Sequence, residues 1–384
     1  MNRSKNKSTE VILQVLPHLG SGGLVSGAIE IANAIVQQGW RSIILTAGGF
    51  RRHEAERIGA EVEILPVDSK NIFTMRRNAT LIEMFCKKNQ VSLIHARSRA
   101  PAWSAFWALK NINIPFVTTF HGTYGSRGPF KKAYNRVMLK SDRTIAISSF
   151  IKEHIEDIYG KTDNIVTIPR GVDTKLFSPL AVTAERSVSL AKRFKVDEMV
   201  PVVLMPGRMV RWKGHMLALE ALLYLKRPNV RLLFIGDDEG KHTYIRQLQE
   251  KAKNLGVDGQ IQFVGHSRDM PSVFKLSDVV LSLSTKPEAF GRVIVEALAM
   301  GRPVVATDNG AAKELIDHKQ TGWLVSVNDP RGIAEAISKC LDLSSKDREI
   351  LASRAIKSVK KNYTTKKMCT STIELYKGLI AKSK

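Results

Sequence analysis

The chain has 384 residues, of which 43% are hydrophobic and 25% are charged. These values are typical of globular proteins and exclude a fully disordered or fibrous chain, and the length predicts two domains, or three. Lys and Arg outnumber Asp and Glu by 59 to 36, a formal net charge of +23, so we expect an anionic partner: nucleic acid, a membrane surface or a phosphorylated substrate.

The positive charge is concentrated toward the two ends of the chain. Residues 1–150 carry a formal charge of +12, residues 151–350 only +3, and residues 351–384 carry +8. The three cysteines, Cys86, Cys340 and Cys369, are too few and too scattered for a disulfide framework or a zinc site, which favours a reducing compartment. No signal peptide and no apolar run of membrane-spanning length stands out. We therefore expect a cytoplasmic protein that meets a membrane only at the cytosolic surface.

Short apolar runs alternate with helical patterns along the whole chain, and such runs are typical of parallel strands covered on both faces. The first helix is predicted by apolar residues at helical spacing from Ala28 to Val36, with Gly39 at the position of a C-cap. The predicted strands of the first half are 11–17, 42–47, 62–67, 93–96, 115–120, 143–148 and 164–169.

A polar, charged stretch at 178–198 separates this first array from a second one, and the last 34 residues form a helical, Lys-rich tail. Two successive arrays joined by a hinge predict an α/β fold of two Rossmann-like, doubly wound domains facing each other. The ligand is expected in the cleft between them, at loops that follow the carboxyl ends of the strands. The predicted strands of the second half are 202–206, 231–235, 261–264, 278–283, 303–307 and 323–327.

Two turns of the first half could contact a ligand in that cleft. Gly20, Gly22 and Gly23 follow the first strand, where glycines let backbone N–H groups approach a phosphate at a helix N-terminus. The turn lacks the third glycine of a dinucleotide fingerprint, since position 25 is Val25. His121 follows a strand and precedes a glycine, so its ring would project into the cleft. A tight structural turn and a hydrogen-bonded loop histidine are the alternatives.

The segment 207–214 follows the first strand of the second half and opens a helix. Arg208 and Lys213 bracket its turn, and both side chains, like the helix N-terminus itself, attract phosphate. The pattern is not a Walker loop, and a solvated basic loop is the alternative.

The segment 288–296 is the most informative of the chain. Glu288 lies in a loop, Gly291 can expose backbone N–H groups at a helix start, and Glu296 lies inside that helix among apolar residues, so we expect Glu296 to face the cleft rather than solvent. Carboxylates accept hydrogen bonds from vicinal hydroxyls. Two cations for a diphosphate and two carboxylates for hydroxyl-rich rings together predict a nucleotide sugar. The acidic run 237–239 lacks a supporting cluster, so no metal is expected.

Taken together, these segments resemble the retaining GT-B glycosyltransferases of family 4. The resemblance rests on 207–214, 288–297 and 301–306, with 20–23, 120–122 and 168–173, and it covers nearly the whole chain. We then expect an acceptor-side domain at 1–178, a nucleotide-sugar domain at 179–355 and a basic helix at 356–384 that packs back on the first domain. The resemblance implies metal-free transfer of a hexose with retention at the anomeric carbon, without any cofactor besides the nucleotide-diphosphate sugar as donor substrate.

The resemblance also implies roles for single residues. Arg208 and Lys213 would bind the donor diphosphate, Glu288 would hold hydroxyls of the donor sugar, and His121 would support the charged transition state. These four are the expected catalytic residues.

Further residues are expected to bind the donor without taking part in the chemistry. They comprise a glycine loop that closes over the substrates, a residue beside the base, backbone N–H groups at the sugar and phosphate, and a carboxylate on the ribose: Gly22, Gly23, Gly236, Phe290, Gly291 and Glu296. One position departs from the family pattern, because Arg170 stands where the linker motif usually has Asn.

Within the family, the segments 95–103 and 118–124 are similar to enzymes of lipopolysaccharide-core assembly, often mannosyltransferases. With the C-terminal helix on the first domain, most of the net charge would lie on one lobe, as a docking face for the inner membrane or an anionic, lipid-linked acceptor. The docking elements would be the loop 70–77 and the segment 128–143, whose cations at 132, 136, 140 and 143 follow helical spacing beside Phe130. A solvated basic face is the alternative. The residues expected on this face are Arg76, Arg77, Arg97, Arg99, Lys132, Arg136 and Lys140.

Two other functions compete with this one. A different GT-B enzyme, such as a nucleotide-sugar epimerase or a disaccharide synthase, would share the donor motifs. A nucleic-acid-binding protein is suggested by charge alone, but no helix-turn-helix, RNP or zinc-finger motif supports it, so no nucleic-acid partner is expected. The donor base and sugar, the acceptor hydroxyl and the oligomeric state stay open.

Overall fold

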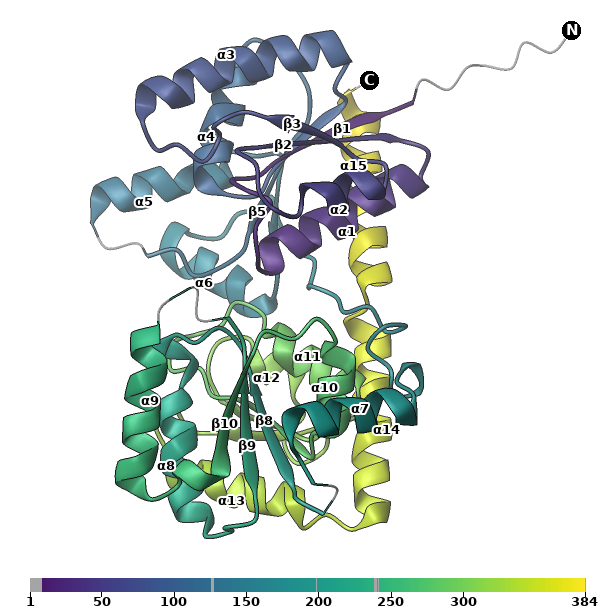
Figure 1. Cartoon of the computed structure of the whole chain (residues 1–384). Helices are drawn as coiled ribbons and strands as arrows, with labels where there is room; N and C mark the ends of the chain where they lie inside the picture. The colour runs from purple at the N-terminus through teal and green to yellow at the C-terminus, as the bar shows by residue number, and fades with distance from the viewer. Residues whose placement is uncertain (1–8, 126–127, 198, 238–239, 241, 384) are drawn as a thin grey trace, which may run out of the picture. The chain divides into compact units, whose positions relative to one another are not determined.

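The computed structural model describes residues 9–125, 128–197, 199–237, 240 and 242–383. It divides into two compact units, Met1–Arg170 with Lys366–Lys384 and Gly171–Thr365 (Figure 1). Each unit is built on one parallel sheet with helices between the strands, so the predicted α/β class with two Rossmann-like domains is confirmed. The chain passes between the units after Arg170 and again after Thr365, instead of near residues 178 and 355.

The first unit has a seven-stranded sheet in the order β3-β2-β1-β4-β5-β6-β7. All its strands except the two edge strands, β3 and β7, are largely buried, as their continuous apolar runs predict. The strands are β1 (Val11–Val15), β2 (Arg41–Thr46), β3 (Glu61–Ile64), β4 (Leu93–Ala96), β5 (Phe116–Phe120), β6 (Arg143–Ala146) and β7 (Ile165–Thr167). The helices are α1 (Gly23–Gln37), α2 (Arg52–Arg57), α3 (Ile72–Asn89), α4 (Arg99–Ala108), α5 (Pro129–Asn135), α6 (Ser149–Tyr159) and α15 (Thr365–Ser383).

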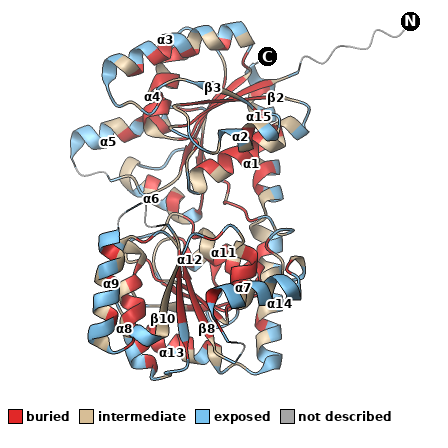
Figure 2. Ribbon diagram, viewed as in Figure 1, coloured by how far each residue is buried: buried red, intermediate tan, exposed pale blue. Residues whose placement is uncertain are grey.

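Helix α15 belongs to the core of the first unit although it ends the chain. Its buried side chains, Tyr376 among them, share one apolar cluster with Ile31 and Ile35 of α1 and with buried residues of the four strands β1, β4, β5 and β6. In Figure 1, α15 runs beside α1, and Figure 2 shows its inner face buried. Because the units divide before Lys366, the first unit carries a formal charge of +15 and the second +8.

The second unit has a six-stranded parallel sheet in the order β10-β9-β8-β11-β12-β13. The strands are β8 (Val202–Pro206), β9 (Arg231–Ile235), β10 (Ile261–Gly265), β11 (Val279–Ser282), β12 (Val304–Thr307) and β13 (Trp323–Val325). The helices are α7 (Ala184–Phe194), α8 (His215–Leu225), α9 (His242–Leu255), α10 (Met270–Leu276), α11 (Arg292–Ala299), α12 (Ala312–Leu315), α13 (Pro330–Leu341) and α14 (Ser345–Asn362).

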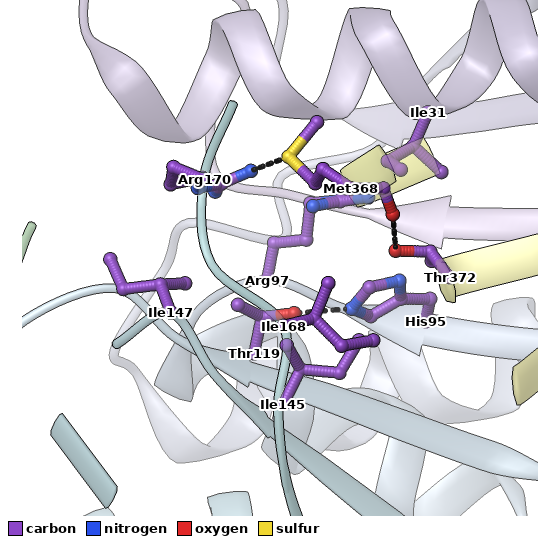
Figure 3. A pocket seen from close by; sticks show the side chains of 10 residues that line it. All are labelled: Ile31, His95, Arg97, Thr119, Ile145, Ile147, Ile168, Arg170, Met368 and Thr372. Carbon is purple, nitrogen blue, oxygen red and sulfur yellow. Dashed lines mark hydrogen bonds between the residues drawn. The ribbon is translucent and has the colours of Figure 1, made fainter. Parts of the chain in front are cut away.

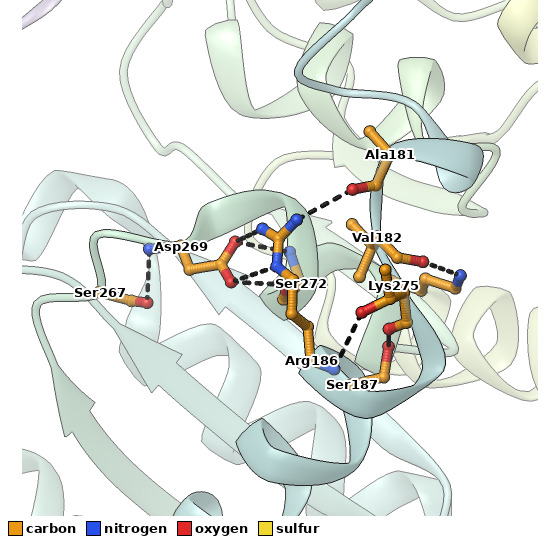
Figure 4. A network of polar contacts seen from close by, with 9 residues as sticks. Ala181, Val182, Arg186, Ser187, Ser267, Asp269, Ser272 and Lys275 are labelled. Carbon is orange, nitrogen blue, oxygen red and sulfur yellow. Dashed lines mark hydrogen bonds and ion pairs between the residues drawn. The ribbon is translucent and has the colours of Figure 1, made fainter.

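A surface network holds α7 on this unit (Figure 4). Arg186 of α7 pairs with Asp269, the N-cap of α10, at 2.7 Å. Lys275 of α10 donates hydrogen bonds to the carbonyls of Pro179 and Val182, which precede α7. The polar stretch that separates the two arrays in the sequence is thus folded onto the second unit.

The basic tail forms two helices, not one. Helix α14 ends at Asn362, and the next residues pair with the first residues of the second unit: Val172 donates from its backbone N–H to the Tyr363 carbonyl at 2.9 Å and accepts from Thr365 at 3.0 Å. These two backbone hydrogen bonds join the segments at which the chain enters and leaves the second unit.

The expected helical stripe over 128–143 is wrong. Helix α5 ends at Asn135, a 3-10 turn covers Arg136–Leu139, and Arg143 begins strand β6. Val137 and Met138 are buried within the 3-10 turn, and because the segment is divided among three elements, the four cations do not share one helix face. No described helix is both long and apolar enough to cross a membrane.

Candidate functional site

The second unit has a switch point between β8 and β11. From β8 the chain adds β9 and β10 on one side, and from β11 it adds β12 and β13 on the other. In sheets of this kind ligands bind at the carboxyl ends of the two strands where the direction changes. The loop after β8 contains Lys213, and the loop after β11 contains Glu288.

Lys213 and Glu288 form an ion pair at this switch point. The Lys213 Nζ lies 2.5 Å from Oε1 of Glu288, and the two side chains are only 18% and 17% exposed. Ser284 donates a hydrogen bond from Oγ to the same carboxylate oxygen. A carboxylate has two oxygens and can accept several hydrogen bonds, so Glu288 could also bind a hydroxyl group. The predicted cation and carboxylate are therefore brought together.

Glycines let the loops around this pair approach one another. A Cβ on Gly236, which follows β9, would lie 1.7 Å from the Gly207 carbonyl oxygen, so only glycine fits there. Gly214, the N-cap of α8, has φ +84°, and a Cβ on it would lie 2.0 Å from the Leu283 carbonyl oxygen. The loop after β8 is thus packed against the ends of both neighbouring strands, which positions Lys213.

A pocket opens beside Glu288 at the carboxyl ends of β11 and β12. Gly291, with φ +95°, is the N-cap of α11, so the first turn of that helix borders the pocket. Helix N-termini favour anions. The lining therefore offers hydroxyls, an amide, a carboxylate and a helix start: Ser282, Ser284, Glu288, Phe290, Gly291, Ile294, Thr307, Asn309 and Ala312.

The sequence interpretation missed the polar residues of this pocket. Ser284 and Asn309 each come just after a buried strand, at the same sheet edge as Glu288. Their position after neighbouring strands was the signal that could have found them. Thr307, the last residue of β12, donates to the Ser284 carbonyl at 2.8 Å and so holds the two strand ends together.

The remaining predicted donor residues lie around the same loops. Glu296 of α11 is 13% exposed and pairs with Arg292, one turn earlier, at 3.2 Å. Arg208 is exposed in the loop after β8. Of the acidic run 237–239, residues 238 and 239 lie outside the described residues; the Asp237 carbonyl accepts a hydrogen bond from Met209 at 3.0 Å, which ties the ends of β8 and β9 together.

The first unit has its own switch point, between β1 and β4, and polar side chains are buried there. Arg97, directly after β4, is 1% exposed and donates from Nε to Gln14 of β1 at 2.7 Å. His95 of β4 lies between the hydroxyls of Tyr376 and Thr119, at 2.5 and 2.7 Å. Burial, and then the charges of Arg97 and Arg170, hold the pKa of His95 well below its usual range.

These buried residues line a small pocket that includes both arginines (Figure 3). The expectation that Arg97 lies on an acceptor or membrane face is therefore wrong. Arg97 follows β4, and its side chain lines the pocket together with Ile31 of α1 and Thr372 of α15. The pocket also has an apolar side, with Met368 of α15 among its residues.

His121 follows β5 in this unit, as predicted. Its Nδ1 lies 2.7 Å from Nη2 of Arg170, and its Nε2 is shielded from solvent with no hydrogen-bond partner among the described residues. Burial, and then the charges of Arg170 and Arg97, hold the pKa of His121 well below its usual range. Gly22 is the N-cap of α1 with φ +106°, and Gly23 begins that helix.

The other cations expected on a docking face are at least partly accessible. Arg76 and Arg77 lie exposed on the second turn of α3, and Lys132, Arg136 and Lys140 are exposed. Arg99 is partly buried: it donates to Asn135 at 3.0 Å and lies over the Tyr124 ring.

Comparison with known proteins agrees with this geometry. The model "Glycosyltransferase Family 4" matches residues 21–176, and "Glycosyl transferases group 1" matches residues 189–358. A solved glycosyltransferase from Rickettsia africae ESF-5 is 36% identical, with a TM-score of 0.91 over 97% of this chain and 99% of that one. The N-acetyl-alpha-D-glucosaminyl L-malate synthase of Bacillus anthracis is 25% identical over 383 residues, 96% of each chain.

The fold is shared more widely than the sequence. HepE of Anabaena, solved in complex with UDP, is 24% identical, with a TM-score of 0.85 over 96% of this chain and 100% of that one. Two family models match successive parts of the chain, and a 36% identical glycosyltransferase spans nearly all of it. The chain therefore belongs to the group 1 glycosyltransferases, of the GT-B type.

Proposed function

We propose that this glycosyltransferase moves a hexose from a nucleotide-diphosphate sugar to an anionic, lipid-linked acceptor of the cell envelope, of the lipopolysaccharide-core kind, with retention and without a metal. The observation that carries the donor part is the Lys213–Glu288 pair beside a hydroxyl-lined pocket. A lysine and a helix start suit a diphosphate, and a carboxylate with serine, threonine and asparagine suits a sugar.

In the proposed reaction the acceptor hydroxyl attacks the anomeric carbon on the face from which the diphosphate departs. The carbon–oxygen bond to the diphosphate breaks, the bond to the acceptor oxygen forms, and the hydroxyl proton passes to a leaving phosphate oxygen. In this proposal Lys213 and Arg208 stabilise the negative charge that develops on the diphosphate, as preorganised cations do; what supports it is the position of Lys213 at the sheet edge. Glu288 holds the sugar hydroxyls, Glu296 binds the ribose, and His121 supports the charged transition state.

The test replaces Lys213 by Ala and follows donor hydrolysis and transfer. A screen of nucleotide sugars for slow hydrolysis first names the donor. At saturating donor, Lys213→Ala should then lower kcat roughly 10²–10³-fold, the effect of removing one preorganised electrostatic contact. Lys253→Ala removes the same charge from an exposed site on α9 and should keep full turnover. Full turnover of Lys213→Ala would show that the diphosphate does not bind there.

The acceptor part of the proposal rests on exposed cations of the first unit, whose whole sequence carries a formal charge of +15. Phe130 of α5 is 90% exposed beside Lys131 and Lys132, and Phe73 of α3 is 76% exposed near Arg76 and Arg77. Exposed aromatic side chains among cations are typical of proteins that bind an anionic membrane surface. Each such cation contributes about 1 kcal/mol near an anionic leaflet, and the attraction falls with salt.

Vesicle co-sedimentation tests this part. The protein should bind anionic vesicles at low salt and release them at high salt, and Phe130→Ser should weaken binding. Leu180→Ser is the matched control, since Leu180 is 95% exposed but lies on the second unit. Equal binding to neutral and anionic vesicles at low salt would contradict an electrostatic docking face.

A further inference from the structure

Arg170 occupies a slot built from three parts of the first unit. It follows β7, is 7% exposed, and places Nη2 at 2.7 Å from Nδ1 of His121. Its Nη1 lies 3.8 Å from the sulfur of Met368 on α15 (Figure 3). On the α1 side, a Cβ on Gly27 would lie only 1.8 Å from Nη1, so this helix leaves room for the guanidinium by carrying no side chain there.

The contact between Arg170 and His121 determines which ring nitrogen carries the proton. A guanidinium donates hydrogen bonds and cannot accept them, so Nδ1 of His121 must be the acceptor in the 2.7 Å contact. The histidine is then the neutral tautomer with its proton on Nε2. An imidazolium would place an N–H group against the guanidinium, and Arg97 adds a second positive charge nearby.

We propose that Arg170 is a positioning residue that holds His121 as a neutral imidazole with its proton on Nε2, so that the ring takes part in transfer as a hydrogen-bond donor. This inference rests on the proposed function, in which His121 takes part. It adds that His121 carries no charge and that its Nε2, which already bears a proton, cannot act as the base. The proton of the acceptor hydroxyl therefore goes to the leaving diphosphate. Nε2 is shielded from solvent and has no hydrogen-bond partner among the described residues, so its N–H is a donor that these residues leave without an acceptor.

A purely structural role for Arg170 predicts something different. Arg170 also contacts the sulfur of Met368, and its removal would leave space under α1, so a loss of stability alone would not separate the two roles. The pH dependence of transfer separates them. Loss of the guanidinium charge raises the pKa of His121 in either case, but only a positioning role makes transfer fall as His121 becomes protonated.

The experiment follows His121 by ¹⁵N NMR in the full chain, with His121→Gln to assign its signals. In the unaltered protein His121 should show the Nε2–H tautomer and stay neutral down to pH 6. In Arg170→Met, which keeps length but cannot donate, His121 should titrate closer to the ordinary histidine range near 6.5. Transfer at pH 6 should fall roughly 10- to 100-fold, as when an outer partner of a functional histidine is lost, and less at pH 8. Arg170→Lys, which keeps a charged donor, should restore part of the activity.

Gly27→Ala provides a second perturbation that keeps Arg170. The added methyl group would displace the end of a flexible side chain, the guanidinium, away from Nδ1, so the titration of His121 should shift in the same direction. Gly378→Ala on α15, where a Cβ would meet nothing within 4 Å, is the matched control and should leave His121 unchanged. This pair keeps the test decisive if Arg170→Met does not fold.

Each outcome decides between the proposals. If His121 keeps the same tautomer and titration in Arg170→Met and Gly27→Ala, Arg170 does not position it and the inference is overturned. If the titration shifts but transfer is unchanged at every pH, His121 takes no part in the reaction, which overturns its place in the proposed function and the inference with it. If Lys213→Ala keeps full turnover, the diphosphate assignment fails, but the inference about Arg170 and His121 is decided separately by the titration of His121 and the pH dependence of transfer.

Discussion

Protonation of His215 should destabilise the second unit in mild acid. His215 begins α8 directly after Gly214 and is 0% exposed, and its ring centroid lies 5.5 Å from that of Phe234 and 5.8 Å from that of Tyr244. Burial, and then the charge of Lys213, lower the pKa of His215 to about 4. A helix N-terminus also disfavours a cation. The folded unit therefore keeps this ring neutral where an unfolded chain would protonate it.

The size of the effect follows from the two pKa values. The pKa of His215 is near 6.5 in the unfolded chain and about 4 in the folded unit. At a pH between these two values, the unfolded chain therefore binds one more proton at His215 than the folded protein does. The free energy of unfolding therefore falls as the pH drops through this window, by about 1.4 kcal/mol per unit at most. The full loss below pH 4 is about 3 kcal/mol, and about 2 kcal/mol of it appears between pH 7 and pH 5.

Urea unfolding of the protein and of His215→Leu, at pH 7 and pH 5, measures this loss. Leucine is close in volume to histidine and cannot titrate. Between pH 7 and pH 5 the His215→Leu variant should therefore lose about 2 kcal/mol less of its free energy of unfolding than the unaltered protein. His95 and His121, whose pKa values are also lowered, act equally in both chains and cancel in the difference. Equal losses in the two chains would refute the reasoning.

Three further predictions concern packing. Gly236→Ala should destabilise the second unit by roughly 1–3 kcal/mol in urea unfolding and raise the KM for the donor, because its methyl group would meet the Gly207 carbonyl. Gly259→Ala is the control in urea unfolding, since a Cβ there would meet no atom within 4 Å. Arg186→Ala should cost at most about 1 kcal/mol in the same assay, since both partners in its pair with Asp269 are well exposed. The native thiols should react slowly with a disulfide reagent at pH 8 and fast in urea, because all are buried with raised pKa values: Cys86, Cys340 and Cys369.

The pairing of Lys213 with Glu288 in the candidate site could be partly predicted because its signals are local. A buried strand followed by glycines and a cation, as at 202–214, places Lys213 at the carboxyl edge of a sheet without any long-range knowledge. The same reasoning places Glu288 after β11. Lys213 and Glu288 can pair because β8 and β11 are neighbours in the sheet. The sequence indicates this neighbourhood only if a doubly wound strand order is assumed.

The first unit was harder to predict because its polar residues are defined by tertiary contacts. Arg97 follows a strand as Arg208 does, yet it is buried and bound to Gln14 on a neighbouring strand, while Arg208 is exposed. Nothing within a few residues of either arginine distinguishes them. The helical spacing of the cations after residue 128 misled for a similar reason. No proline or glycine marks the end of α5 at Asn135, and the 3-10 turn that follows, with Met138 buried, is visible only in the fold.

The burial of two arginines changes what the net charge says about partners. Arg97 and Arg170 count toward the +15 of the first unit, but neither is accessible to a membrane or a lipid-linked acceptor. Salt screens exposed charges over about 8–10 Å at physiological strength and buried ones much less. Raising the salt concentration should therefore weaken docking through Lys132 and its exposed neighbours while the contact between Arg170 and His121 persists. The same net charge thus has two roles, which respond differently to ionic strength.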